Sequence, residues 1–276
     1  MEYAIQDVAQ IIGARTKALH DCTISILLTD SRRLSFPETS LFFALATKTN
    51  DGHRYVQDLY KLRVRNFVVS KMLPEFEQME EANFMLVKDV LAALQKLVAY
   101  HRKRFQIPVI GITGSNGKTV VKEFLYQLLH NEFDIVRSPR SYNSQIGVPL
   151  SVWEMNEKNT LGIFEAGISQ PDEMEKLQPI IAPTIGVLTS IGEAHQENFI
   201  SVNQKCLEKL MLFNESEAII YDGDNPLIST LIESACLSHK AIAWSRTDRE
   251  APLFIESIEK RQDETVIHCT LLGFDR

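Results

Sequence analysis

One segment constrains the fold more than any other: an apolar strand that runs into a glycine-rich turn and then into a helix. Residues 109–113 are apolar or small, and Gly114 and Gly117 follow them. Lys118 and Thr119 then open a stretch with helical character. In such a turn, successive backbone N–H groups and the N-terminus of the helix can surround an anionic phosphate. The segment therefore predicts a phosphate-binding loop at the carboxyl end of a buried strand.

The residues of this loop suggest separate roles. The Lys118 ammonium can reach the terminal phosphates of a nucleotide, and the Thr119 hydroxyl can bind Mg²⁺. The generic pattern G-x-x-x-x-G-K-[ST] would need glycine where Ile112 stands, so the spacing indicates a nucleotide phosphate but no particular reaction. The predicted nucleotide-binding residues are Gly114, Ser115, Asn116, Gly117, Lys118 and Thr119.

Strands and helices alternate regularly around and after this loop. Alternation of apolar strands with helices is typical of a parallel sheet that helices cover on both faces. Two later segments with period-two patterning, 254–258 and 265–270, indicate an antiparallel hairpin. The expected strands are 107–112, 134–137, 160–165, 184–189, 217–221 and 241–244, and the expected helices are 117–131, 146–155, 171–179, 201–213 and 225–235.

The first part of the chain predicts a separate, small α/β domain with shorter strands. An amphipathic helix over residues 90–105 has apolar side chains three and four positions apart, and we assign it to the second domain. The boundary is therefore expected near residue 84, which gives domains of residues 1–84 and 85–276. The chain stops at Arg276 without a closing helix, so we expect the second domain to be cut at its C-terminal end.

Composition limits the possible partners. The chain has 36 acidic and 29 basic residues, a net charge of −7, so no overall positive field attracts nucleic acid or anionic lipid. No apolar stretch approaches the roughly 20 residues of a membrane span, and the first residues lack the apolar core of an export signal. The four cysteines stand far apart, which favours reduced thiols over a disulfide framework or a zinc site. These features predict a cytoplasmic protein.

Several motifs, in order along about a hundred residues, resemble the Mur ligases, the ATP-dependent amide-forming enzymes of peptidoglycan synthesis. Two of them are similar to the branch that joins D-alanyl-D-alanine to a UDP-N-acetylmuramoyl-tripeptide: Val121-Lys122-Glu123 and the segment 142–150, which carries an I-G-V-P pattern. Residues 164–171 also resemble variants of that ligase that are fused to an alanine racemase. The full set of similar segments is 113–119, 121–123, 142–150, 165–167 and 192–195.

The resemblance implies a reaction in two steps. ATP transfers its γ-phosphoryl group to the terminal carboxylate of the UDP-linked tripeptide, and the amine of D-alanyl-D-alanine then displaces phosphate from the acyl phosphate. It implies ATP and Mg²⁺ as cofactors. It also implies a third domain beyond Arg276, so we expect little or no ligase activity from these 276 residues alone.

The resemblance also assigns residues to metal binding and catalysis. Glu165 ends an apolar strand, and its spacing leaves open whether it holds Mg²⁺ or begins the next helix; the resemblance favours the metal. In the family, the histidine that His195 matches accompanies a second Mg²⁺. The lysine that Lys209 matches is carbamylated there by CO₂ and becomes a metal ligand. Lys205 lies four residues earlier on the same helical face and is expected to be solvated. The predicted catalytic residues are Lys118, Lys209 and His195, and the predicted metal ligands are Thr119, Glu165, His195 and carbamylated Lys209.

Two further pairs of residues are candidates for substrate binding. Ser31 and Arg32 follow a strand of the first domain and resemble a family segment that receives the UDP end of the substrate, although an Asp-Ser turn is an alternative. Asn143 and Gln145 follow the second strand of the loop domain. They could contact the γ-phosphate or the substrate, or serve as a helix cap.

Three alternative functions stay open. The chain could perform another Mur ligase step that adds a single amino acid, or it could resemble folylpolyglutamate synthetase, against which the Asp30-Ser31-Arg32 segment argues. A nucleotide-binding switch without ligase chemistry is a third. Binding of a UDP-muramoyl peptide would distinguish a ligase from a switch.

Overall fold

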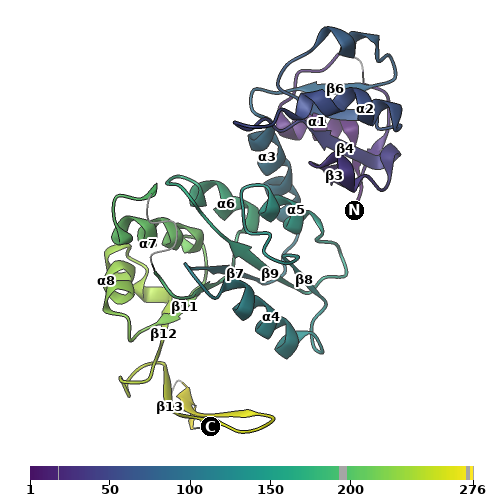
Figure 1. Ribbon diagram of the computed structural model, residues 1–276. Coiled ribbons are helices and arrows are strands. Elements are labelled where there is room, and N and C mark those ends of the chain that lie inside the picture. The colour runs from purple at the N-terminus through teal and green to yellow at the C-terminus, as the bar shows by residue number, and fades with distance from the viewer. Residues whose placement is uncertain (18, 193–197, 272–273, 276) are drawn as a thin grey trace. The chain divides into compact units, whose positions relative to one another are not determined.

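The computed structural model describes residues 1–17, 19–192, 198–271 and 274–275 (Figure 1). The chain forms two compact units, Met1–Phe105 and Gln106–Arg276. This boundary differs from the one expected near residue 84, because helix α3 (Val90–Arg102) packs against helix α1 (Ile5–Ile12) and buries Leu94 and Leu97 within the first unit. The amphipathic pattern identified the helix but could not indicate which domain its apolar face covers.

The first unit is built on a four-stranded parallel sheet, as the small α/β domain of the prediction requires. Phe42 and Phe67 from the two central strands are almost completely buried, and Phe67 stacks on Phe84 at 5.4 Å between ring centroids. The described part of the unit also contains a short antiparallel pair, one further α-helix and several short 3-10 helices. Its remaining elements are β1 (Tyr3–Ala4), β2 (Thr23–Ile24), β3 (Ile26–Leu28), β4 (Ser40–Phe43), α2 (Val56–Lys61), β5 (Asn66–Val69) and β6 (Asn83–Leu86).

In the described part of the second unit, nine strands form one sheet in the order β15-β14-β13-β12-β11-β10-β7-β9-β8. The strands from β8 to β13 pair in parallel, and β13, β14 and β15 pair antiparallel, so the mostly parallel sheet and the late hairpin of the prediction are confirmed. The strands are β7 (Val109–Thr113), β8 (Ile135–Arg137), β9 (Leu161–Ala166), β10 (Ile185–Leu188), β11 (Ala218–Asp222), β12 (Ala241–Ser245), β13 (Leu253–Lys260), β14 (Thr265–Leu271) and β15 (Phe274–Asp275).

Helices cover both faces of the central strands of this sheet. Helix α4 (Lys118–Leu129) lies on one face, and α5 (Gly147–Trp153) and α6 (Met174–Ile181) lie on the other (Figure 1). Helix α7 (Val202–Leu210) packs against α6, and α8 (Pro226–Ser234) packs against α7. The core beneath α4 combines strand residues Ile110, Ile112, Leu161 and Ile163 with Val121, Leu125 and Leu129 of the helix.

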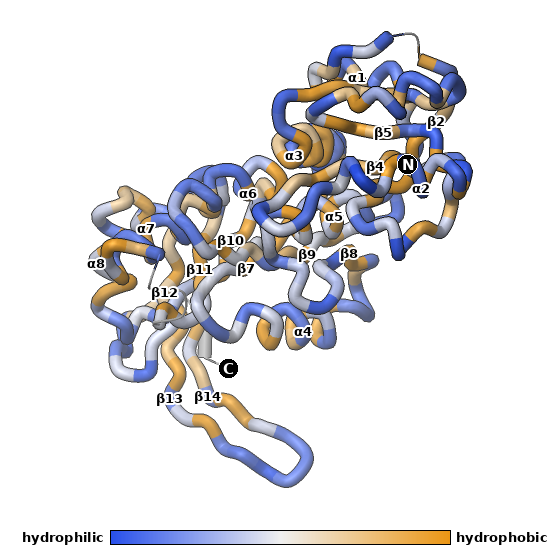
Figure 2. The backbone as a smooth tube through the Cα atoms, turned by 45° about the horizontal axis from the view of Figure 1, so that its top comes forward, coloured by the Kyte–Doolittle hydropathy of each residue, from blue (hydrophilic) through white to orange (hydrophobic). Residues whose placement is uncertain are grey.

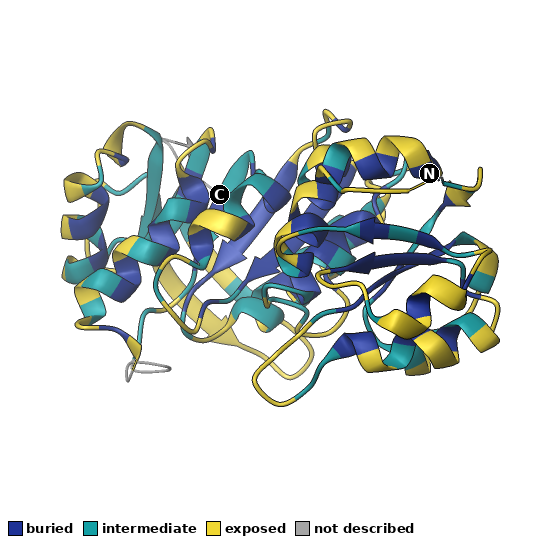
Figure 3. Cartoon of the chain, turned by 90° about the horizontal axis from the view of Figure 1, so that it is seen from above, coloured by how far each residue is buried: buried dark blue, intermediate teal, exposed yellow. Residues whose placement is uncertain are grey.

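Burial falls from the middle of this sheet toward its hairpin. The strands at the centre are buried, whereas the outer part of β13 and most of β14 are exposed (Figure 3). The β13–β14 hairpin extends beyond the other strands and has a hydrophilic tip (Figure 2). None of the described helices is both long enough and apolar enough to span a membrane.

The position of β7 explains why its loop is a candidate site. β7 pairs on one side with β9 and on the other with β10, in the middle of the parallel strands. The carboxyl ends of parallel strands meet at one edge of a sheet, and ligands bind in the crevice outside that edge. The loop after β7, the end of β9 and the segment after β10 therefore lie next to one another.

Candidate functional site

The backbone of the loop after β7 requires glycine. Gly114 has a φ of 150° and Gly117 a φ of 87°, values that residues with side chains rarely adopt. A Cβ atom on Gly114 would lie 1.9 Å from Thr189 Oγ1, so even alanine would clash there. The segment after β10 supports the loop directly, because the Ser115 N–H donates to Ser190 O at 2.7 Å. The predicted phosphate-binding loop is thus fixed between two strands, with its helix beginning immediately after it.

Lys118 lies over this loop. It is the first residue of α4, and its Nζ donates to Gly114 O at 2.8 Å and to Ser115 O at 3.4 Å. Burial lowers the pKa of Lys118, and the charge of Glu165 partly opposes that shift. An ammonium group held at a loop of backbone N–H groups creates a local positive field suited to an anion.

Thr119 and Glu165 meet as the sequence predicts for a metal site. The Thr119 hydroxyl donates to Glu165 Oε2 at 2.9 Å, and the Glu165 side chain on β9 is fully buried. Both groups are hard oxygen donors, which Mg²⁺ prefers, and Mg²⁺ in phosphate sites uses few protein ligands. The described residues contain no cluster of three or more His, Cys, Asp or Glu side chains, so the residues present fit a cation completed by phosphate and water rather than a closed protein cage.

Lys122 is a residue that the sequence analysis does not assign to the site. It lies on α4 with its side chain fully buried, and its Nζ is 3.0 Å from Glu165 Oε1 and 3.2 Å from Glu123 Oε1. It also donates to Ser138 O at 2.8 Å and to Arg140 O. Two signals in the sequence pointed to it: its spacing from Lys118, which places both lysines on one helical face, and its position in the family-like segment Val121-Lys122-Glu123.

Lys209 reaches the same loop from α7. Its side chain is buried, and its Nζ donates to Gly114 O at 3.1 Å, the carbonyl that Lys118 also contacts. Burial lowers the pKa of Lys209 to about 7, and the charges of Lys118 and Lys205 act in the same direction. A lysine with this pKa has a substantial neutral fraction near pH 7, which is the form that reacts as an amine.

The expectation that Lys205 is solvated is wrong. Lys205 is buried and donates to Gly192 O, because it lies on the same face of α7 as Lys209. A helical spacing shows which residues share a face, but not whether that face covers another segment. His195, the predicted partner of a second Mg²⁺, lies outside the described residues.

Asn143 and Gln145 lie near the carboxyl end of β9 and contact backbone there. Asn143 O accepts the Gly167 N–H at 2.7 Å, and Asn143 Oδ1 lies against Gly167. Gln145 Nε2 donates to Glu173 O at 3.0 Å. Both residues are only partly buried, so they border this edge of the sheet with part of their surface accessible.

Ser31 and Arg32 lie in the first unit, just after the carboxyl end of β3. Asp30 caps the short 3-10 helix Ser31–Arg33 and accepts from the Arg32 N–H at 3.1 Å. The Arg32 guanidinium forms two further bonds to Asp30, at 2.9 and 2.7 Å, and its hydrogen bond lowers the pKa of Asp30 to about 2. The Arg32 side chain is otherwise exposed, so a phosphate could approach it.

A second network at this edge of the small sheet was not predicted. His53 is buried, and its Nδ1 lies 2.6 Å from Asp51 Oδ1, while its Nε2 accepts the Ser70 N–H at 3.0 Å. Lys71 Nζ donates to Asp51 Oδ2 at 2.7 Å. His53 therefore connects the segment after β4 to the end of β5, and its Nδ1 carries the proton that Asp51 accepts.

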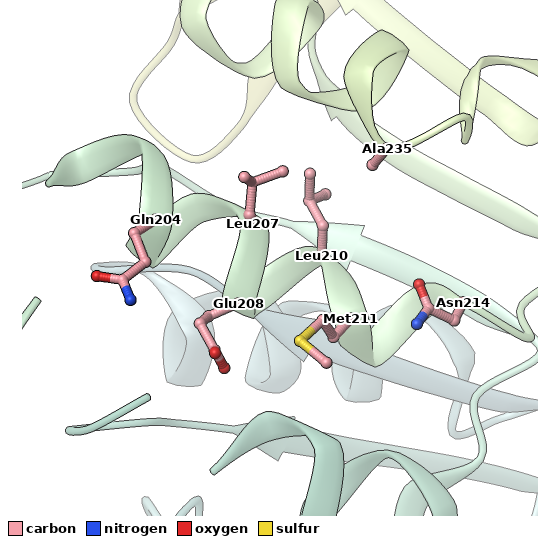
Figure 4. Close-up of a pocket in the computed structure, with 7 residues that line it drawn as sticks. All are labelled: Gln204, Leu207, Glu208, Leu210, Met211, Asn214 and Ala235. Carbon is pink, nitrogen blue, oxygen red and sulfur yellow. The ribbon is translucent and has the colours of Figure 1, made fainter. Parts of the chain in front are cut away.

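A pocket of about 240 Å³ lies beside α7 (Figure 4). Glu208 projects from α7 beside Met211, and its Oε1 accepts the Asp172 N–H at 3.2 Å. None of the predicted site residues lines this pocket, so it is separate from the loop. Its lining residues are Gln204, Leu207, Glu208, Leu210, Met211, Asn214 and Ala235.

Known proteins resemble the chain in both sequence and fold. UDP-N-acetylmuramoyl-tripeptide–D-alanyl-D-alanine ligase of Bacillus subtilis (strain 168) is 32% identical over 229 residues, which are 81% of this chain and 49% of that ligase. A crystal structure of MurF from Acinetobacter baumannii superposes with a TM-score of 0.87 at 22% identity, covering 98% of this chain and 59% of that one. The MurF ligase from Thermotoga maritima, solved in complex with ADP, gives a TM-score of 0.76 at 21% identity over 90% of this chain and 56% of that one.

The chain spans about half the length of the curated relatives it matches. Because these solved structures are only 21–22% identical to the chain, they support the fold alone. The family model described as the Mur ligase middle domain matches residues 112–274, more than half of the chain. This match shows that the chain belongs to the Mur ligase family, and the matched region contains the loop after β7, Glu165 and Lys209.

Proposed function

We propose that the chain supplies the nucleotide and UDP-substrate sites of a cytoplasmic, ATP-dependent ligase that joins D-alanyl-D-alanine to a UDP-N-acetylmuramoyl-tripeptide. The observation that carries this proposal is the convergence of the loop after β7, the Thr119–Glu165 pair and Lys209 at one edge of the parallel sheet. The curated relatives with this activity support the choice of substrates. The unit Gln106–Arg276 would bind the nucleotide, and Met1–Phe105 would bind the UDP end.

The proposed phosphate site uses the loop and its lysine. The N–H groups of residues 114–119 would surround the β- and γ-phosphates, and Lys118 would leave the Gly114 carbonyl to contact them. In the first step, a substrate carboxylate oxygen bonds to the γ-phosphorus, the bond to the bridging oxygen breaks, and ADP leaves. Both reacting groups are anionic, so positioning and positive charge from Lys118 would provide much of the rate.

Thr119 and Glu165 are the proposed ligands of Mg²⁺, which when bound would screen the phosphate charge during transfer. The Thr119 hydroxyl donates to Glu165 and keeps its lone pairs for a cation. The neutral Lys209 amine would attack CO₂, forming an N–C bond and releasing a proton to solvent, which gives a carbamate with carboxylate oxygens. His195 would contribute to a second metal position.

In the second step, the amine of D-alanyl-D-alanine attacks the carbonyl carbon of the acyl phosphate. The carbon–oxygen bond to phosphate breaks, and the amine loses a proton, leaving an amide and inorganic phosphate. Asn143 and Gln145 are the proposed contacts to the γ-phosphate or the peptide, and Ser31 and Arg32 are the proposed contacts to the UDP end.

Calorimetry on the 276-residue chain tests this proposal. A non-hydrolysable ATP analogue with Mg²⁺ should bind the wild type, and Lys118→Met should weaken that binding. Arg32→Ala should weaken binding of the UDP-N-acetylmuramoyl-tripeptide, whereas Lys61→Ala, which removes an exposed cation on α2, should not. Absence of nucleotide binding by the folded wild type would overturn the proposed site.

A ligand panel separates the proposed function from its alternatives. A ligase of the proposed type should bind the UDP-linked tripeptide more tightly than the dipeptide precursor, which would be preferred by an enzyme that adds the third residue. A folylpolyglutamate synthetase would bind a folate, and a nucleotide switch would bind none of the three. Preference for the dipeptide or for folate would exclude the proposed substrate.

A further inference from the structure

Lys122, which is not among the predicted site residues, has a fully buried ammonium group. It lies among four oxygen atoms: two carboxylate oxygens, from Glu165 and Glu123, and two backbone carbonyls, from Ser138 and Arg140. A buried charge is tolerated only when it is paired and hydrogen-bonded. This cage therefore gives Lys122 a defined position, which a lysine at a surface would lack.

The cage connects three segments that are distant in sequence. Lys122 is one turn along α4 from Thr119, Glu165 lies on β9, and Ser138 follows β8. Glu165 Oε2 accepts the Thr119 hydroxyl, whereas among the described residues no hydrogen bond reaches Oε1. The ion pair with Lys122 at 3.0 Å is therefore the contact that holds Oε1.

We infer that Lys122 is a positioning residue for the cation of the nucleotide: by binding Oε1 of Glu165 it keeps Oε2 beside the Thr119 hydroxyl. This inference rests on the proposed nucleotide function. Groups that orient a metal ligand from behind commonly change metal affinity when they are removed, even though they do not touch the metal. A purely structural lysine would stabilise the fold without any specific effect on the cation.

The test compares nucleotide binding with and without metal. Kd for the non-hydrolysable ATP analogue is measured by calorimetry in Mg²⁺ and in EDTA, for the wild type and for Lys122→Met. The Kd in EDTA divided by the Kd in Mg²⁺ measures how strongly Mg²⁺ assists binding. Lys122→Met should reduce this ratio about 10–100-fold. Binding in EDTA should stay unchanged, because the loop N–H groups and Lys118 remain in place. Lys176→Met, at an exposed lysine on α6, is the matched control and should behave as wild type.

Each outcome decides the inference. An unchanged ratio overturns it, and so does an equal loss of binding in Mg²⁺ and EDTA, which would indicate general damage to the loop. A larger ratio would mean that Lys122 competes with the cation for Glu165, and it also overturns the inference. If the wild type binds no nucleotide under either condition, the proposed function fails instead.

A second variant tests the inference if Lys122→Met does not fold. Circular dichroism establishes whether Lys122→Met folds. If it does not, Lys122→Gln decides the question by the same ratio, because it keeps an N–H donor for the Ser138 or Arg140 carbonyl and lacks the positive charge. A folded Lys122→Gln with the wild-type ratio overturns the inference.

Discussion

Lys209 allows a quantitative prediction, because its environment penalises its charge. Unfolded, a lysine of this type binds its proton up to about pH 10.5, whereas in the folded chain the pKa of Lys209 is about 7. Between these values the unfolded state binds more protons, so stability should rise with pH. Since the Lys209 side chain is only 3% exposed, little solvent screening is expected.

The magnitude follows from the size of the shift. Burial together with repulsion from Lys118 and Lys205 makes the charged form of Lys209 cost about 4–5 kcal/mol at pH 7, where one pKa unit corresponds to about 1.4 kcal/mol. Lys209→Met removes this cost but also the hydrogen bond to Gly114 O, which contributes about 1 kcal/mol. The variant should therefore be more stable than wild type by about 3–4 kcal/mol at pH 7, with the difference falling to about 1 kcal/mol at pH 9.

Urea unfolding followed by tryptophan fluorescence measures this difference. The two tryptophans of the sequence, Trp153 and Trp244, both lie in the unit that contains Lys209. The buffers must be free of CO₂ for the comparison. Added bicarbonate should then stabilise the wild type and not Lys209→Met, because only the wild type has the amine that the proposed carbamate requires. A stability difference that does not change between pH 7 and 9 would refute the reasoning.

Three further predictions concern other parts of the chain. Gly114→Ala should destabilise the second unit by about 2–4 kcal/mol in urea unfolding and abolish nucleotide binding, because of the positive φ and the contact with Thr189; wild-type stability would contradict the observed loop. Asp89→Ala should lower the free energy of unfolding of the first unit by about 1 kcal/mol in a circular dichroism melt, since the Asp89 carboxylate caps α3 through hydrogen bonds of 2.8 and 3.0 Å. The control Asp58→Ala, at an exposed residue, should leave this free energy unchanged. Burial raises the pKa of Cys206 to about 11, so iodoacetamide at pH 8 should alkylate it at least about 100-fold more slowly than exposed Cys236, as read by mass spectrometry; equal rates would count against its burial.

The sequence was sufficient for features that depend on local pattern. The strand–loop–helix at residues 109–129, the alternation that gives the parallel sheet, and the proximity of Thr119 and Glu165 all follow from apolar periodicity and from strand ends meeting at one edge. These features need no knowledge of which distant segment covers which face.

The sequence was insufficient where burial depends on distant segments. In the sequence, Lys122 and Lys205 cannot be distinguished from lysines at a surface. They are buried because the segments after β8 and β10 cover them. For the same reason, the observed domain boundary differs from the expected one: the sequence does not show which unit the apolar face of α3 covers. The buried network of His53 was not predicted, because its partner, Ser70, follows a different strand.

The central place of β7 has a consequence for how the chain acquires its structure during synthesis. The Thr113 carbonyl bonds to Thr189, a residue 76 positions later, and the loop cannot take its final shape until that segment has left the ribosome. Such distant pairing makes folding slow and leaves apolar strands exposed while the chain grows. A nucleotide could therefore assist only the last stage of folding, after the sheet has closed around the strand that carries its loop.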